Sequence, residues 1–156
     1  MVLKEVTQLT TEKEYEVISK QYLELKQHIK DCIEFEDFEV LSSYDLTKIK
    51  ELHFTKSALF WKIKVQQVDE RMAEIKQADP FHYQHNVEYC QLAVKKFEYY
   101  AEQKQAELKG NGDYYSFNKH HKPVIDNRIL EWKMRLESSK KLRKMETSPR
   151  KIEVIP

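Results

Sequence analysis

The stretch from Phe54 to Ile75 reads FTKSALFWKIKVQQVDERMAEI. Its apolar residues recur at alternating steps of four and three, at Phe54, Ala58, Trp61, Val65, Val68, Met72 and Ile75. This spacing keeps one stripe of an α-helix facing a neighbouring helix, as in a coiled-coil seam. Because the stretch contains no glycine or proline, it predicts one long amphipathic helix, which we expect to span residues 44–78.

A similar stripe precedes this helix. Thr11 and Glu14 have the spacing of a capping box, so we expect the first helix to begin there. The apolar positions that follow are Tyr15, Ile18, Tyr22, Leu25, Ile29 and Cys32. The pattern then changes toward alternation, and it leaves open whether residues 33–42 continue the first helix.

Two more stripes follow the central helix. Asp79-Pro80 suits a helix start, because Asp is a good N-cap and Pro is tolerated at the first helical position. The third stripe ends before Gly110, which we expect to stop the helix. Pro123 begins the fourth pattern. The apolar positions of the two stripes are Tyr83, Val87, Cys90, Val94, Phe97, Ala101 and Leu108, then Ile125, Ile129, Trp132 and Leu136.

Composition supports a helical fold. The chain has only two glycines and four prolines, which is too few for the many tight turns of a β-sandwich or barrel, and it is 34% charged and 40% hydrophobic. We therefore expect an all-α protein, an antiparallel bundle of about four long amphipathic helices with coiled-coil-like seams. Residues 1–146 form one domain in this interpretation, and residues 147–156 form a flexible tail. A dimerising helical hairpin would have the same seam spacing, so the oligomeric state stays open.

Charge, hydropathy and cysteine content indicate the cellular compartment of the protein. The net charge of +1 combines −5 over residues 1–42 (5 Lys/Arg, 10 Asp/Glu) with +6 over residues 109–156 (12 Lys/Arg, 6 Asp/Glu). The N-terminal sequence lacks the apolar stretch of a signal peptide, and no apolar run is long enough to cross a membrane. With only Cys32 and Cys90, which we expect to be reduced, the sequence predicts an intracellular protein, cytoplasmic or nuclear.

Catalytic motifs are missing. No glycine-rich phosphate loop is present, and both cysteines occupy seam positions where a thiol is unreactive. His82 and His85 share a helix face with Glu88, but a metal site needs three or four ligands and no other helix supplies a matching set. We expect no enzyme activity, no catalytic or metal-binding residues and no cofactor or small-molecule substrate. No motif identifies a family.

The leading functional hypothesis is a non-enzymatic helical interaction protein, which is an adaptor, an assembly subunit or a protein inhibitor. Four seams cannot bury every apolar residue of the central helix, so we expect its remaining apolar side chains to contact a protein partner or a second copy of the chain. These predicted contact residues are Leu52, Leu59, Phe60 and Ile63.

The alternative hypothesis is a nucleic-acid-binding helical protein. The segment KGNGDYYSFNKHHKP, residues 109–123, is longer than a helix–helix turn requires and combines aromatic rings with lysines, and the last helix is basic. Aromatic rings can stack on unpaired bases while cations bind phosphates. The candidate residues are Tyr114, Tyr115, Phe117, Lys119, Lys122, Lys140, Lys141, Arg143 and Lys144. Whether the three aromatic side chains point into the bundle or outward stays open.

Overall fold

The computed structural model describes residues 2–35 and 43–147. Its four long helices are α1 (Val2–Glu34), α2 (Ser43–Ala78), α3 (Val87–Gly110) and α5 (Lys122–Thr147), and α4 is a single turn (Tyr114–Ser116). A 3₁₀ turn (Tyr83–His85) precedes α3, and a π-helical segment (Phe117–His121) joins α4 to α5. The described residues contain no strand, which confirms the predicted all-α class of packed helices.

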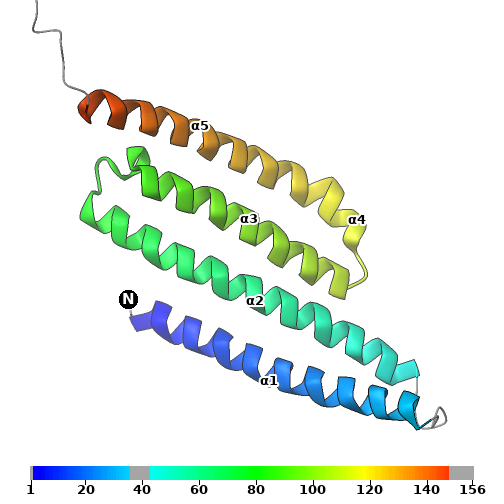
Figure 1. The fold of residues 1–156 in the computed structure, drawn as a ribbon. Helices are drawn as coiled ribbons and strands as arrows, with labels where there is room; N and C mark the ends of the chain where they lie inside the picture. The colour runs from blue at the N-terminus through cyan, green and yellow to red at the C-terminus, as the bar shows by residue number, and fades with distance from the viewer. Residues whose placement is uncertain (1, 36–42, 148–156) are drawn as a thin grey trace, which may run out of the picture.

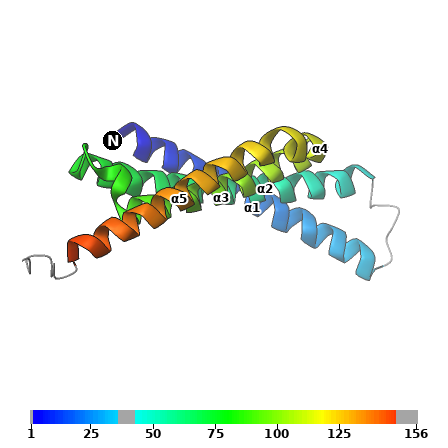
Figure 2. The same ribbon diagram turned by 90° about the horizontal axis from the view of Figure 1, so that it is seen from above.

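The long helices lie antiparallel in a row that follows the order of the chain (Figure 1). Helix α2 packs between α1 and α3, and α3 packs between α2 and α5. The most extensive contact joins α2 to α3. Figure 2 shows that the row is a thin, twisted layer in which the helices cross at an angle. The edge helices α1 and α5 therefore each pack against one long helix of the described chain.

The core lies along the α2–α3 interface and reaches α5. Val68 and Met72 of α2 meet Ala93 of α3, which is fully buried. The partly buried residues packed against this cluster are Tyr89, Leu92, Tyr99 and Trp132. Because alanine lets the two backbones approach closely, the small side chain at position 93 suits the middle of the row, where α3 has a helix on each side.

The start of α1 differs from the prediction. The helix begins at Val2, and Thr11 is buried inside it, where its Oγ1 accepts a hydrogen bond from Nε2 of Gln66 on α2 at 3.2 Å. The capping-box spacing was misleading because Thr11 is a polar residue of the α1–α2 seam. At the other end, α1 stops at Glu34. Residues 36–42, for which continuation was left open, lie outside the described part, as does most of the predicted tail.

The start of α3 was also predicted wrongly. Asp79 and Pro80 belong to a connection, in which the Asp79 carbonyl accepts hydrogen bonds from the backbone N–H groups of His82 and Tyr83. The helix begins at Val87, and the N-cap is Asn86, whose Oδ1 accepts from the backbone N–H of Tyr89 at 2.9 Å. Asparagine is as good an N-cap as aspartate, so local preference alone does not choose between the two positions.

The segment between α3 and α5 is mostly helical. Gly110 ends α3 and allows close packing, since a Cβ atom there would lie 3.3 Å from Cβ of Phe54. Gly112 adopts a positive φ of 73° in the turn that follows. The sequence suggested a helix start at Pro123, and α5 begins one residue earlier, at Lys122, directly after the π-helical segment. The π-helical segment, in which Lys122 N–H donates to the Phe117 carbonyl, widens the turn ahead of a proline that has no N–H to donate.

Candidate functional site

The four predicted contact residues of α2 have different environments. Leu52 is only 5% exposed and belongs to the core of this chain, because α1 and α3 cover α2 from two sides. Ile63 is half-buried, and the half-buried Leu59 lines a hollow of about 520 Å³ between α2 and α3. Phe60 is 39% exposed, which makes it the most accessible of the four.

Phe60 lies in a groove between α1 and α2. The residues that line this groove are Tyr15, Tyr22, His53, Lys56, Ser57 and Phe60, and they enclose about 310 Å³. Two cross-helix ring pairs form it, with centroids 6.4 Å apart for Tyr15 and Phe60 and 6.1 Å apart for Tyr22 and His53. The aromatic side chains supply an apolar surface where the two helices meet. We call this feature the α1–α2 groove.

Lysine ammonium groups surround these rings. Lys26 Nζ lies 5.8 Å and Lys56 Nζ 5.1 Å from the centroid of the Tyr22 ring. Lys64 Nζ lies 5.5 Å from the centroid of Phe60. At these distances the positive charge interacts favourably with the ring face, and the lysine stem covers part of the ring. The α1–α2 groove thus combines apolar rings with three positive charges.

Sequence reasoning had placed Tyr15 and Tyr22 on the stripe of the first helix that faces a partner. Both rings do face α2, and because they are only half-buried they also contribute ring surface to the groove. A signal for this was present, because Lys26 follows Tyr22 by four residues and Lys64 follows Phe60 by four residues. Residues four apart are neighbours on a helix surface, so a tyrosine or phenylalanine with lysine at this spacing indicates a solvent-facing ring.

The aromatic residues between α3 and α5 point in different directions. Phe117 is 5% exposed and stacks on Tyr114, with centroids 6.2 Å apart and an interplanar angle of 15°. Tyr115 is 70% exposed, and Lys119 Nζ lies 5.6 Å from its centroid. Lys109 Nζ lies 4.8 Å from the Tyr114 ring. Phe117 therefore belongs to the interior, and Tyr115 has the ring that a partner can reach.

The predicted basic residues form two separate groups. All of them have exposed side chains: Lys119, Lys122, Lys140, Lys141, Arg143 and Lys144. The 18 residues from Lys122 to Lys140 span about 27 Å of helix at 1.5 Å per residue, so the first two cations and the last four lie toward opposite ends of α5. The second group also meets negative charge, since Lys140 Nζ lies 3.6 Å from Glu137.

A polar hollow of about 470 Å³ lies where the connection before α3 meets the last part of α5. Its lining residues are Asp79, His82, His85, Asn86, Val87, Glu88, Ser139, Leu142 and Arg143. The fold thus brings the histidines considered for metal binding close to Glu88, but no group of three potential ligands able to hold a metal ion occurs within residues 2–35 and 43–147. Cys90 is fully buried, and its Sγ lies 3.3 Å from the Gln84 carbonyl and 3.6 Å from Ser139 Oγ.

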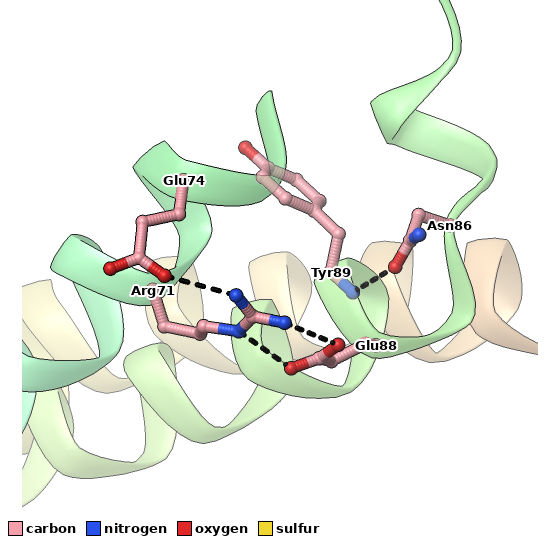
Figure 3. A network of polar contacts seen from close by, with 5 residues as sticks. All are labelled: Arg71, Glu74, Asn86, Glu88 and Tyr89. Carbon is pink, nitrogen blue, oxygen red and sulfur yellow. Dashed lines mark hydrogen bonds and ion pairs between the residues drawn. The ribbon is translucent and has the colours of Figure 1, made fainter. Parts of the chain in front are cut away.

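Arg71 of α2 binds Glu88 at the edge of this hollow (Figure 3). Its Nε and Nη2 donate to the two Glu88 carboxylate oxygens at 2.8 and 3.1 Å, and its Nη1 donates to Glu74 at 2.9 Å. The hydrogen bonds from Arg71 hold the pKa of Glu88 below its ordinary value, and those to Glu88 and Glu74 raise the pKa of Arg71. The bidentate pair ties α2 to the beginning of α3.

The Arg71–Glu88 pair predicts a pH dependence of stability. Because the pKa of Glu88 is lower in the folded chain, its contribution is present above the ordinary glutamate pKa and is lost as the pH falls through the folded-state pKa. We expect the urea midpoint of Glu88→Gln to fall less than that of the unaltered chain between about pH 6 and about pH 3. Glu98→Gln, at an exposed position of α3, is the control. Identical pH profiles for Glu88→Gln and the unaltered chain would contradict this prediction.

Comparison of the chain with protein-family models, curated proteins and solved structures gave no significant match. None of the helices in the described part has a stretch both long and apolar enough to span a bilayer.

Proposed function

We propose that this chain is a non-enzymatic helical interaction protein, an adaptor, assembly subunit or protein inhibitor that binds another protein through its helix faces. The observation that carries the proposal is the α1–α2 groove, where Tyr15, Tyr22 and Phe60 present ring surface beside lysine charges. Aromatic side chains bordered by polar groups are typical of the parts of interfaces that contribute most binding energy.

The shape of the molecule supports the same proposal. In a row of helices the surfaces between neighbouring helices stay accessible, whereas a closed bundle directs its seams toward a common interior. Exposed apolar side chains also occur on the edge helix α1 beside the groove, among them Val17 and Leu23. These surfaces suit contacts with a partner protein or with a second copy of the chain.

The polar hollow is weaker support for an enzyme than the α1–α2 groove is for an interaction protein. Glu88 is engaged by Arg71, and Ser139 is almost fully buried beside the Cys90 thiol. A catalytic nucleophile needs an activating base within hydrogen-bond reach and access to a substrate. Ser139 Oγ lies 3.6 Å from the Cys90 thiol, and a thiol does not act as an activating base for a serine hydroxyl.

Substitution of Phe60 tests the proposal. We expect the immobilised chain to capture a specific protein from nuclease-treated extract of its own organism, and Phe60→Asp to reduce capture at least about tenfold, which corresponds to about 1.4 kcal/mol. Leu130→Asp, which places the same charge at an exposed apolar position of α5, is the control and should retain binding. Far-UV circular dichroism of each variant verifies its folding. Failure to capture any protein, together with a monomeric mass in solution, would contradict the proposal.

Nucleic-acid binding is the second candidate, and the exposed Tyr115 ring with Lys119 over it favours it. This alternative predicts binding of single-stranded RNA or DNA that weakens steeply with salt. Charge reversal at Lys140, Lys141, Arg143 and Lys144 should then abolish binding, while Phe60→Asp should not. Absence of binding at low salt would eliminate the alternative.

A further inference from the structure

We propose that the α1–α2 groove is the docking site for a short acidic segment of a partner protein, which inserts an apolar side chain between the rings and places carboxylates near the lysines. The inference rests on the proposed function and specifies the chemistry of the partner. The groove has suitable dimensions, because about 310 Å³ is at the small end of ligand-sized pockets and suits a protruding side chain better than a whole cofactor.

The charges of the α1–α2 groove are available for a partner. Within the described residues, Lys26, Lys56 and Lys64 form no ion pair. Elsewhere a comparable lysine is neutralised within the chain, as for Lys96, whose Nζ lies 2.7 Å from Asp69. Since no acidic residue lines the groove either, its electrostatic complement is an anionic partner.

The rings explain why the partner segment needs an apolar residue as well as charge. Tyr22 and Phe60 each have a lysine ammonium group within 6 Å of the ring centroid. A carboxylate of the partner can attract these ammonium groups away from the ring faces, which then become free to contact an apolar side chain. Release of ring surface and neutralisation of the lysines thus occur in the same binding event.

A protein segment fits the surroundings of the α1–α2 groove better than a nucleic-acid strand does. Helix α1 forms one wall, and over Val2–Glu34 it carries seven acidic residues against five lysines, a net charge of −2. A strand that follows the groove would place successive phosphates along this acidic helix, whereas nonspecific strand binding requires a continuous positive path. A short segment needs only the three lysines at the groove.

The probe for the test is a fluorescein-labelled peptide with one central leucine flanked on each side by glutamates. We expect the peptide to bind at low salt, to bind more weakly at about 0.15 M salt, and to lose affinity when glutamine replaces its glutamates. Lys56→Glu/Lys64→Glu should weaken binding at least tenfold. The neutral pair Lys56→Gln/Lys64→Gln should weaken it less, and it guards against misfolding of the charge-reversed variant.

The matched control is Lys133→Glu/Lys141→Glu, which makes the same change in net charge at exposed positions of α5. If this control and the groove variant lose the same affinity for the peptide, the proposal is overturned. The peptide would then be attracted by the overall charge of the chain and not by the groove. Failure of the peptide to bind would also overturn the proposal. A labelled single-stranded oligonucleotide that binds the unaltered chain and loses affinity in the groove variant would assign the site to nucleic acid instead.

Capture of the natural partner separates the inference from the proposed function. If a protein is captured and Lys56→Glu/Lys64→Glu leaves capture unchanged, the proposed function stands and this docking site is wrong. If no protein is captured by the unaltered chain and its mass in solution is monomeric, the proposed function itself fails. Loss of capture in the groove variant, with retention in Lys133→Glu/Lys141→Glu, supports both.

Discussion

Replacement of Trp132 with alanine is expected to lower the free energy of unfolding by about 3 kcal/mol. The Trp132 ring lies 5.6 Å from the ring of Tyr89 and packs against the core cluster at the α2–α3 interface. The Arg135 guanidinium covers it at 4.6 Å from the ring centroid. Removal of this side chain leaves a cavity between α3 and α5 that a partly exposed edge helix fills only incompletely.

The position of α5 in the row determines which residues lose protection from hydrogen exchange when Trp132 is replaced. Because α5 packs against α3 and not against α1, we expect hydrogen exchange to accelerate in α5 and in the facing part of α3, while α1 changes little. Urea unfolding gives the total loss. Leu130→Ala is the control, since Leu130 is two residues before Trp132, on the opposite side of α5, and is mostly exposed. A Trp132→Ala variant as stable as Leu130→Ala would contradict this packing.

The second large effect is expected at the centre of the row. Met72 is 8% exposed and meets Ala93 across the most extensive helix contact of the described chain. Met72→Ala should lower the free energy of unfolding by about 2–3 kcal/mol, because alanine loses apolar contact and leaves a cavity that α3, held by α5 on its other side, closes only in part.

The loss of stability in Met72→Ala should affect all four long helices, unlike the loss of stability in Trp132→Ala. Helix α1 is attached through α2, and α5 through α3, so weakening of the α2–α3 contact loosens the connection between the two halves of the row. Hydrogen exchange is therefore expected to accelerate in α1 and α5 alike. Met134→Ala, the same substitution at a 63% exposed position, should change stability by less than about 0.5 kcal/mol. Acceleration confined to α3 would contradict the arrangement.

The interiors of the helices were predictable because their apolar spacing leaves few alternatives. The predicted central helix, 44–78, differs from Ser43–Ala78 by one residue, since its long seam contains neither glycine nor proline. The helix starts were less predictable, because Thr11 and Asp79 satisfy local capping preferences as well as the true N-cap Asn86 does. Tertiary contacts decide among such candidates.

The arrangement of the helices could not be predicted from the stripes. A seam spacing indicates that a helix packs against another helix. It does not indicate which helix that is, or whether four helices close around one common interior. This is why Leu52 was expected to reach a partner, although it is buried in the folded chain. The same limit applies to the groove, since Tyr22 has seam spacing in the sequence and forms a surface only because α1 is at the edge of the row.

Hydrogen exchange of the chain with and without its captured partner tests the central claim most directly. Binding through the α1–α2 groove predicts slower exchange in residues 15–26 of α1 and 53–64 of α2, with α5 unchanged. Slower exchange confined to residues 114–122 or 140–144, with the two segments of the groove unaffected, would contradict the claim and would place the interface at the basic residues of α5.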